Sequence, residues 1–284
     1  MAFDIERFVS LSKAVETSDL DWDYIARVGV TDDEARILRY MADVESHTML
    51  YLRDLLAGHT SRDYEVVAFL SCWVYEETHH GYALDRFLAA CGRAPDKSRY
   101  TQITQGASFR EDIEAFLSHA AARATPHFAA THMTWGAINE MTAALAYTAL
   151  SRYTRNTELA KLLQRLAKDE RRHQSFYYHQ AQKRLEASRI AQTIARFALE
   201  KFWGPVGVGV GESDTFGMIA AMLFDNEWGR SEFAAIDRTI SKLPGLENFN
   251  LVSARIPPTG VAFRQKHPAQ AEAMQASARE RMAA

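Results

Sequence analysis

The sequence predicts an all-α protein built around a bundle of long helices, and two observations carry that prediction. Between residues 31 and 243, apolar residues recur at helical spacing, and runs with a period of two are nearly absent. One pattern also occurs twice: a lone glutamate on an apolar helix is followed about thirty residues later by Glu-x-x-His. That gap fits one helix, a short turn and the return helix. We therefore expect a single helical domain over residues 1–284, with the bundle at about 31–185 and additional helices and a tail at about 186–284.

The helix pair that carries the first copy has clear start and stop signals. Thr31-Asp-Asp-Glu34 resembles a capping box and opens a helix that ends near Gly58. Ser61 or Asp63 begins the next helix, which ends at Cys91-Gly92 because glycine is common just beyond a helix end.

The pair that carries the second copy follows a connecting region. Residues 96–107 are polar and read as a loop, and a helix at about 108–123 comes next. Pro126 suits the start of the following helix. Asn156 or Thr157 then caps a helix that runs to roughly Arg184.

The rest of the chain has less distinctive chemistry. We expect a helix near 187–203, a glycine-rich loop at 204–211, a helix at about 214–242, an irregular tail around Pro257-Pro258 and a terminal helix at 266–284. The glycine-rich stretch lacks the Gly-Lys-Ser/Thr ending of a phosphate-binding loop, and its expected role is close packing between helices.

Composition excludes several classes of function. The formal charge of −3 argues against nucleic acid as the main partner, and 47% hydrophobic residues suffice for a large core. Cys72 and Cys91 lack the spacing of a disulfide framework or a zinc site. Neither a signal peptide nor an apolar run long enough to span a membrane is present, so we expect a soluble, cytoplasmic protein.

The repeated pattern predicts a two-metal centre. Residues i and i+3 share one face of a helix, so each Glu-x-x-His aims a carboxylate and an imidazole at one point. Four helices that supply Glu, Glu-x-x-His, Glu and Glu-x-x-His form the ligand set of a di-iron or di-manganese centre. Two of the glutamates can bridge the metals and the other two act as terminal ligands. The expected ligands are Glu45, Glu77, His80, Glu140, Glu170 and His173.

Random placement of the 20 Glu and 10 His gives fewer than one Glu-x-x-His pair on average, whereas the chain holds three. Two of them overlap, because Glu76 pairs with His79 as readily as Glu77 with His80, and spacing does not choose between them. The alternative for all these residues is a solvated helix face, but the flanks are too apolar for that.

Neighbouring residues offer supporting roles. Glu76 and Asp169 each precede an expected ligand and can orient a histidine through its free ring nitrogen. Trp73 lies one turn before Glu77, where an indole can pack over the site or carry electrons, although a core tryptophan is the simpler interpretation. His47 points to a different face from Glu45 and suits a solvent or supporting role. Tyr147, Tyr177 and Tyr178 stay undecided.

Two short segments resemble the soluble acyl-ACP desaturases, a family of ferritin-like di-iron proteins. The segment from Trp73 to Gly81 is similar to the family's Trp-x-x-Glu-Glu-x-x-His-Gly helix, and Ala167 to His173 is similar to its Asp-Glu-x-Arg-His motif. The resemblance covers roughly residues 30–240 and selects Glu77 and His80 over Glu76 and His79. It departs at Ala143, where the family usually has a threonine one turn after the third-helix glutamate.

The resemblance implies a ferritin-like four-helix bundle with additional helices and an O2-dependent di-iron desaturase. It further implies two Fe ions, with Fe/Mn or Mn as alternatives, a fatty acyl chain on acyl carrier protein as substrate, a ferredoxin-like electron donor and a homodimer. Both protein partners are acidic, so a basic patch is expected. The residues that could supply it lie on one stretch of chain: Arg165, Lys168, Arg171, Arg172, Lys183, Arg184 and Arg189.

Two other functions stay open at this point. One is a different di-iron oxidase or oxygenase, which hydroxylates, N-oxygenates or cleaves a small substrate, and the replacement at Ala143 leaves room for it. The other is iron oxidation or storage, which is disfavoured because storage proteins are shorter and add little to the bundle. An acyl tunnel would favour desaturation, whereas a closed polar pocket would favour another oxidation.

Overall fold

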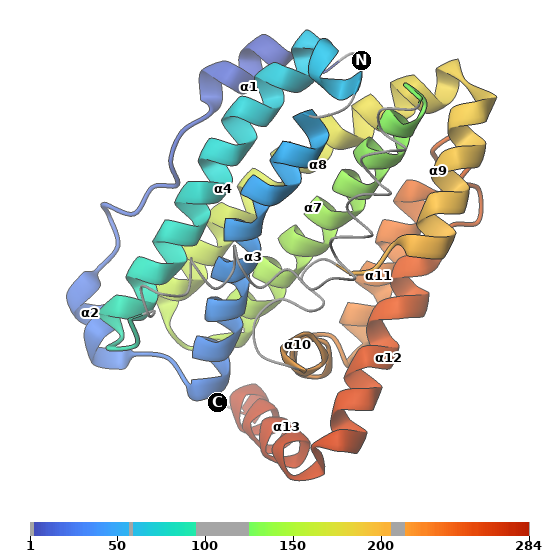
Figure 1. The fold of residues 1–284 in the computed structure, drawn as a ribbon. Coiled ribbons are helices and arrows are strands. Elements are labelled where there is room, and N and C mark those ends of the chain that lie inside the picture. The colour runs from blue at the N-terminus through green and yellow to red at the C-terminus, as the bar shows by residue number, and fades with distance from the viewer. Residues whose placement is uncertain (1–2, 57–58, 95–124, 206–213, 284) are drawn as a thin grey trace.

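The computed structural model describes residues 3–56, 59–94, 125–205 and 214–283, and within these ranges the chain forms helices and no strands. Four long helices lie side by side at the centre of the molecule (Figure 1). These are α3 (Asp32–Leu56), α4 (Tyr64–Ala90), α7 (Phe128–Tyr153) and α8 (Thr157–Ala187). Helix α3 packs on α4 and α7 packs on α8. The predicted all-α, ferritin-like bundle with additional helices is confirmed.

The bundle helices begin and end where their capping residues dictate. Thr31 and Glu34 form the reciprocal capping box, with 3.2 Å from the Glu34 amide to the Thr31 hydroxyl and 2.9 Å from the Thr31 amide to the Glu34 carboxylate. Asp63 caps α4, and Asn156 accepts from two amides at the start of α8. Gly92, at φ 73°, follows the end of α4.

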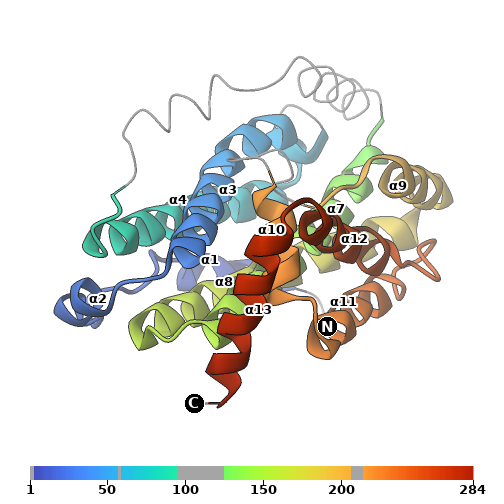
Figure 2. The ribbon, with the colours of Figure 1, turned by 90° about the horizontal axis from the view of Figure 1, so that it is seen from below.

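Further helices surround the bundle. Short helices α1 (Ile5–Leu11) and α2 (Trp22–Val28) contact α4, the 3₁₀ turn η1 (His59–Arg62) joins α3 to α4, and α9 (Arg189–Phe202) contacts α7 and α8. The C-terminal helices, seen from below in Figure 2, extend the bundle on one side. They are α10 (Thr215–Leu223), α11 (Glu227–Ile240), α12 (Leu251–Lys266) and α13 (Pro268–Ala283). The sequence patterns did not predict α1 and α2, although Asp4 and Asp21 cap them as N-cap preference would suggest.

The prediction of one helix at 214–242 is wrong, because Asn226 interrupts it. The side chain of Asn226 accepts a hydrogen bond of 2.7 Å from the Gly229 amide and starts α11 as a new helix. This break lets α10 cross the bundle next to α3 and α7, whereas α11 packs along α12 and α7.

The prediction of an irregular tail around Pro257-Pro258 is also wrong, because both prolines lie inside α12. A proline inside a helix costs roughly 3 kcal/mol. Two distant features oppose that cost. Buried Asp237 of α11 accepts from the amides of Val252 (3.0 Å) and Ser253 (2.9 Å), so it caps α12 from another helix. Gly260 lets α12 approach α10 so closely that a Cβ there would lie 2.9 Å from the Ala221 nitrogen.

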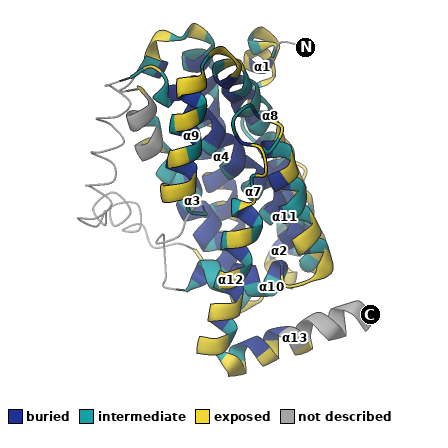
Figure 3. Ribbon diagram, turned by 90° about the vertical axis from the view of Figure 1, so that its right-hand side faces the viewer, coloured by how far each residue is buried: buried dark blue, intermediate teal, exposed yellow. Residues whose placement is uncertain are grey.

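Burial follows this architecture, with the inward faces of the bundle helices buried and the outer faces exposed (Figure 3). None of the helices in the described part of the chain combines the length and apolar character needed to cross a bilayer. The predicted loop at 96–107 and the predicted helix at about 108–123 lie outside the described residues. Residues 206–211 of the predicted glycine-rich loop also lie outside them. The division into a single domain stays a prediction.

Candidate metal centre

Each bundle helix turns one or two of the expected ligands into the core. Glu45 comes from α3, Glu77 and His80 from α4, Glu140 from α7, and Glu170 and His173 from α8. All six side chains are buried. Buried ionisable groups are rare unless they are paired or bind a metal. The structure therefore brings together all six residues that the repeated pattern singled out.

The six residues form two overlapping groups. One comprises Glu45, Glu77, His80 and Glu170, and the other comprises Glu77, Glu140, Glu170 and His173; in each group one ligand-type atom per residue lies within 4.8 Å of the others. Glu77 and Glu170 belong to both groups, so the two Glu-x-x-His glutamates are the shared ones.

Glu170 has the clearest position between the two groups. Its Oε1 lies 3.2 Å from His80 Nδ1 and its Oε2 lies 3.1 Å from His173 Nδ1. Each carboxylate oxygen thus faces a different histidine. Glu77 Oε1 also lies between them, 2.9 Å from His173 Nδ1 and 3.9 Å from His80 Nδ1. These carboxylates have the placement that bridging two metal ions requires.

The outer nitrogens of the two histidines bind carboxylates in a crossed arrangement. Glu76 of α4 binds His173 of α8, with 2.6 Å between Oε2 and Nε2. Asp169 of α8 lies 3.4 Å from His80 Nε2 on α4. Such carboxylate contacts fix the ring orientation and leave Nδ1 for a metal. The pattern had suggested both carboxylates for this role but not which histidine each would hold.

Arg172 joins these two carboxylates and is a residue that the sequence suggested only as part of a basic patch. Its Nη2 lies 2.7 Å from Glu76 Oε1 and 3.2 Å from Asp169 Oδ1. One guanidinium therefore binds both of the carboxylates that orient the two histidines. Its position i+3 from Asp169 was visible in the sequence, but its contact with α4 was not.

Each of the two lone glutamates accepts a side-chain hydrogen bond from an aromatic residue. Trp73 Nε1 donates to Glu140 Oε1 over 3.1 Å, and the Tyr147 hydroxyl donates to Glu45 Oε1. Trp73 thus contacts a residue of one cluster, and Tyr147, which the sequence left undecided, contacts a residue of the other. Tyr177 packs edge-on to Trp73 at 6.1 Å between ring centroids.

Two other histidines lie apart from the centre. His79 packs between Tyr75 and Tyr82 on the outer face of α4, with ring centroids 4.5 and 6.0 Å away. His47 Nδ1 lies 2.8 Å from the Asp43 carbonyl oxygen. Of the two overlapping Glu-x-x-His pairs, Glu77 and His80 therefore both face the centre. In the other pair, His79 faces away from it.

The protonation of the centre shows how much negative charge it concentrates. Burial raises the pKa of Glu45 and Glu77, and repulsion from Glu170 adds to the shift. Burial also raises the pKa of Glu140 to about 8, against the hydrogen bond of His173. For His80, burial disfavours the charged ring, but hydrogen bonds to Asp169 and Glu170 outweigh it and raise the pKa to about 10. Without a metal, the two histidines supply too little positive charge for the four buried glutamates of the centre to be ionised at the same time.

A pair of divalent cations fits this donor set. Three buried atoms that face the centre, Glu77 Oε1, His80 Nδ1 and Glu170 Oε1, make no well-aligned hydrogen bond among the described residues, although each lies 2.9–3.2 Å from an imidazole or a carboxylate of the centre. Unpartnered buried polar atoms are costly unless something binds them. Carboxylate and imidazole ligands suit iron or manganese. The buried clusters could therefore hold metal ions, with Glu77 and Glu170 between them.

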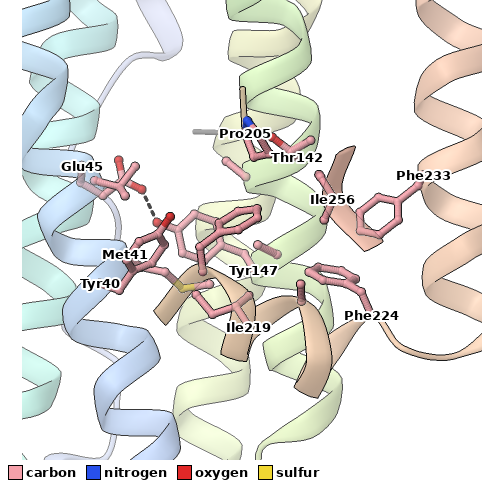
Figure 4. Close-up of a pocket in the computed structure, with 15 residues that line it drawn as sticks. Tyr40, Met41, Glu45, Thr142, Tyr147, Pro205, Ile219, Phe224, Phe233 and Ile256 are labelled. Atoms are coloured by element: carbon pink, nitrogen blue, oxygen red, sulfur yellow. Dashed lines mark hydrogen bonds between the residues drawn. The ribbon is translucent and has the colours of Figure 1, made fainter. Parts of the chain in front are cut away.

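An apolar pocket opens at Glu45. Its walls come from α3, α7, α10, α11 and α12, and it includes Ala143 and Thr142 of α7 (Figure 4). The space inside it that a water-sized molecule can occupy is about 70 Å³, so the pocket is small in this conformation. Most of its side chains are apolar: Met41, Val44, Ala143, Ala146, Pro205, Phe216, Ile219, Ala220, Phe224, Phe233 and Ile256.

A helical bundle with two overlapping carboxylate–histidine clusters defines a candidate two-metal oxidoreductase. A family model for fatty acid desaturase matches residues 47–201, more than half of the chain. The chain belongs to the fatty acid desaturase family. The matched segment includes Glu77, Glu140 and Glu170 with both histidines, and it begins two residues after Glu45. No curated protein and no solved structure matches the chain.

Proposed function

We propose that this protein is an O2-dependent di-iron desaturase that introduces a double bond into a fatty acyl chain carried on acyl carrier protein. The observation that carries the proposal is the apolar pocket that reaches Glu45, because it joins an apolar space to the buried clusters of a fatty acid desaturase family member. An apolar pocket of this kind suits an alkyl chain and offers few partners to a polar substrate.

The proposed roles of the residues follow from their positions. Glu77 and Glu170, which belong to both clusters, would be shared by two metal ions; Glu45 with His80 would complete the ligands of one ion, and Glu140 with His173 those of the other. Glu76, Asp169 and Arg172 hold the histidines, and Trp73 holds Glu140; an electron path through Trp73 stays a prediction. When bound, the irons supply the chemistry that couples loss of two hydrogens from adjacent carbons to reduction of O2 to two waters, with two electrons and two protons from outside.

The pocket residues position the chain for that reaction. A substrate that lies between α7 and α10 places one segment of its alkyl chain beside Glu45, and the side chains beyond fix how far it enters. Phe224 and Phe233 lie away from Glu45 in the close-up, so we assign them to the part of the pocket that limits chain length (Figure 4).

The protein partners belong to the same proposal. We expect acyl carrier protein and a ferredoxin-like donor to bind, and the chain to form a homodimer. Four of the basic residues expected to serve them already pair with carboxylates: Arg165 with Asp19, Arg172 with Glu76, Lys183 with Glu65 and Arg184 with Asp63. The proposal therefore depends on the others, Lys168, Arg171 and Arg189, of which Arg171 binds the Thr148 hydroxyl at 2.9 Å.

The first experiment is metal reconstitution. Protein loaded anaerobically with Fe(II) should hold about two irons per chain and develop the absorption of an oxo-bridged di-ferric centre when O2 is admitted. Glu77→Ala and Glu170→Ala should lose both features, whereas Glu186→Ala, an exposed change on the same helix as Glu170, should keep them. Absence of stoichiometric metal in the unaltered protein would refute the proposal.

The second experiment identifies the substrate. Acyl chains of different length on acyl carrier protein, on coenzyme A and as free acids are supplied with a ferredoxin-like donor, and products are analysed by mass spectrometry. Loss of two hydrogens from the carrier-bound chain supports the proposal. Ala143 lines the pocket next to the centre and favours one alternative, another di-iron oxidation, which gain of an oxygen atom would reveal.

A further inference from the structure

The hydrogen-bond donors on the two lone glutamates lie in different surroundings. Trp73 reaches Glu140 from α4, and Tyr147 reaches Glu45 from α7. Among the described residues, Glu45 lines the apolar pocket and Glu140 does not. The pocket therefore meets the candidate centre at the side held by tyrosine.

Tyr147 lies at the boundary between the pocket and the metal-binding residues. It follows Glu140 by two helical turns, so both side chains leave the same face of α7. Its side chain lines the pocket, while its hydroxyl points to Glu45, and only 2% of the residue is exposed (Figure 4). Ala143 and Ala146 flank it on α7 and leave space for the ring and for a ligand.

The hydrogen bond restricts how Glu45 can bind a metal. A carboxylate can bind one metal through both oxygens or through one. A hydrogen bond to one oxygen lowers the donor strength of that oxygen and fixes the orientation of the group. With that oxygen occupied by the hydrogen bond, Glu45 would bind a metal through the other oxygen and would leave one more coordination position available to a ligand.

We propose that Tyr147 is a positioning residue that keeps Glu45 bound through one oxygen and so leaves an open coordination position on the metal facing the pocket. This inference rests on the proposed two-metal site. It makes the two metal positions unequal: a small ligand enters from the pocket at the position held by Glu45 and His80, and the position held by Glu140 and His173 is the enclosed one.

The test uses azide as a small anionic probe of the open position. The di-ferric protein is titrated with azide, and its affinity is read from the azide–iron charge-transfer absorption. Tyr147→Phe removes only the hydroxyl and keeps the ring in an apolar pocket, so Glu45 is free to chelate with both oxygens. We expect azide affinity to fall at least about tenfold, the lower end for loss of a group that supports a metal ligand.

Three further variants make the result specific. Tyr147→Leu removes the same hydroxyl by a second route and should change azide affinity in the same direction. Tyr178→Phe removes a phenol hydroxyl that binds the Thr239 carbonyl oxygen and does not line the pocket, and should leave the affinity within about twofold. Trp73→Phe removes the donor on Glu140 and should also leave it unchanged. Circular dichroism and metal analysis accompany each titration.

The outcomes separate this inference from the proposed function. If the unaltered protein binds no metal, the proposed function fails and the inference with it. If it binds two irons but Tyr147→Phe keeps full azide affinity, or Trp73→Phe loses as much, the inference alone is overturned. Loss of a metal in folded Tyr147→Phe also overturns it, since the hydroxyl would then retain the metal instead of limiting how Glu45 binds.

Discussion

The helix pairs α3–α4 and α7–α8 carry the same ligand pattern, yet they meet different surroundings. Glu45 of the first pair faces a pocket whose far wall belongs to α10, α11 and α12, outside the bundle. Glu140 of the second pair accepts from Trp73, which packs in an aromatic group with Phe69 and Tyr177. A repeated pattern therefore supplies matched ligands, and the unrepeated helices decide which side a substrate reaches.

The two pairs also differ in how their helices meet. Helices α7 and α8 cross at Gly136, where a Cβ would lie 2.5 Å from the Tyr177 ring. Helices α3 and α4 meet at Gly81, where a Cβ would lie 3.4 Å from the Glu45 Cβ, an ordinary contact. The second pair is packed more tightly at its glycine, and that contact involves Tyr177, which packs on Trp73, the donor to Glu140.

The largest expected effect distinguishes shared from unshared ligands. Glu170 belongs to both clusters, so Glu170→Ala should reduce iron content from about two per chain to near zero. Glu45 and Glu140 belong to one cluster each, so Glu45→Ala and Glu140→Ala should each retain about one iron. Metal analysis after anaerobic loading measures this. Equal losses in all three variants would mean that the two positions fill together.

The second prediction concerns pH and separates metal-free from metal-loaded protein. Folded Glu140, with a pKa raised to about 8 from 4.5, keeps a proton that the unfolded chain loses, so stability falls as pH rises through that window. His80, raised to about 10 from 6.5, continues the fall at higher pH. Metal ions replace these protons, so their stabilisation should grow with pH.

Thermal unfolding between pH 5 and 9, with and without metal, measures the difference. The melting temperature of metal-free protein should decrease steadily over this range, while that of loaded protein should change less. Glu140→Gln, which cannot lose a proton, should flatten the metal-free curve between pH 5 and 8. Parallel curves for metal-free and loaded protein would contradict the prediction.

The third prediction concerns Arg172, whose side chain connects the two helix pairs. Arg172 contacts Glu76 of α4 and Asp169 of α8, and each of these carboxylates holds a histidine of the other pair. Arg172→Gln should weaken metal binding about 10- to 100-fold, as loss of such supports typically does. Arg165→Gln, which breaks only exposed contacts with Asp19 and the Glu16 carbonyl oxygen, should leave metal affinity unchanged. Competition with a chelator measures both affinities.

Helical geometry relates a glutamate to a histidine three residues later, so the Glu-x-x-His pairs could be predicted from spacing. The choice of Glu77 and His80 over Glu76 and His79 came from the resemblance to the desaturases, and Glu45 and Glu140 came from their order and spacing along the chain. The bundle followed from the same periodicity and from caps such as Asp63 and Asn156. The Glu-x-x-His pairs and the helix caps each involve residues that are close in sequence, and spacing along a helix determines the face on which a side chain lies.

Features that depend on contacts between distant residues could not be predicted. The sequence could not show that Glu76 binds His173 and Asp169 binds His80, because the register between α4 and α8 is a tertiary property. Helix α12 appeared irregular because its cap, Asp237, lies on another helix. Tyr147 stayed undecided for the same reason, since its partner Glu45 is 102 residues away.

The smallest expected effect concerns the helix crossings. Gly136→Ala places a methyl group against the Tyr177 ring and should lower the free energy of unfolding by about 1–3 kcal/mol, as overpacking does. Gly81→Ala meets only ordinary contacts and removes a poor helix former, so it should be neutral or stabilise by up to about 1 kcal/mol. Urea unfolding of the metal-free proteins measures both changes. Because Tyr177 packs on Trp73, Gly136→Ala should also disturb Glu140 more than Glu45, and similar costs in both variants would show that the two pairs are packed alike.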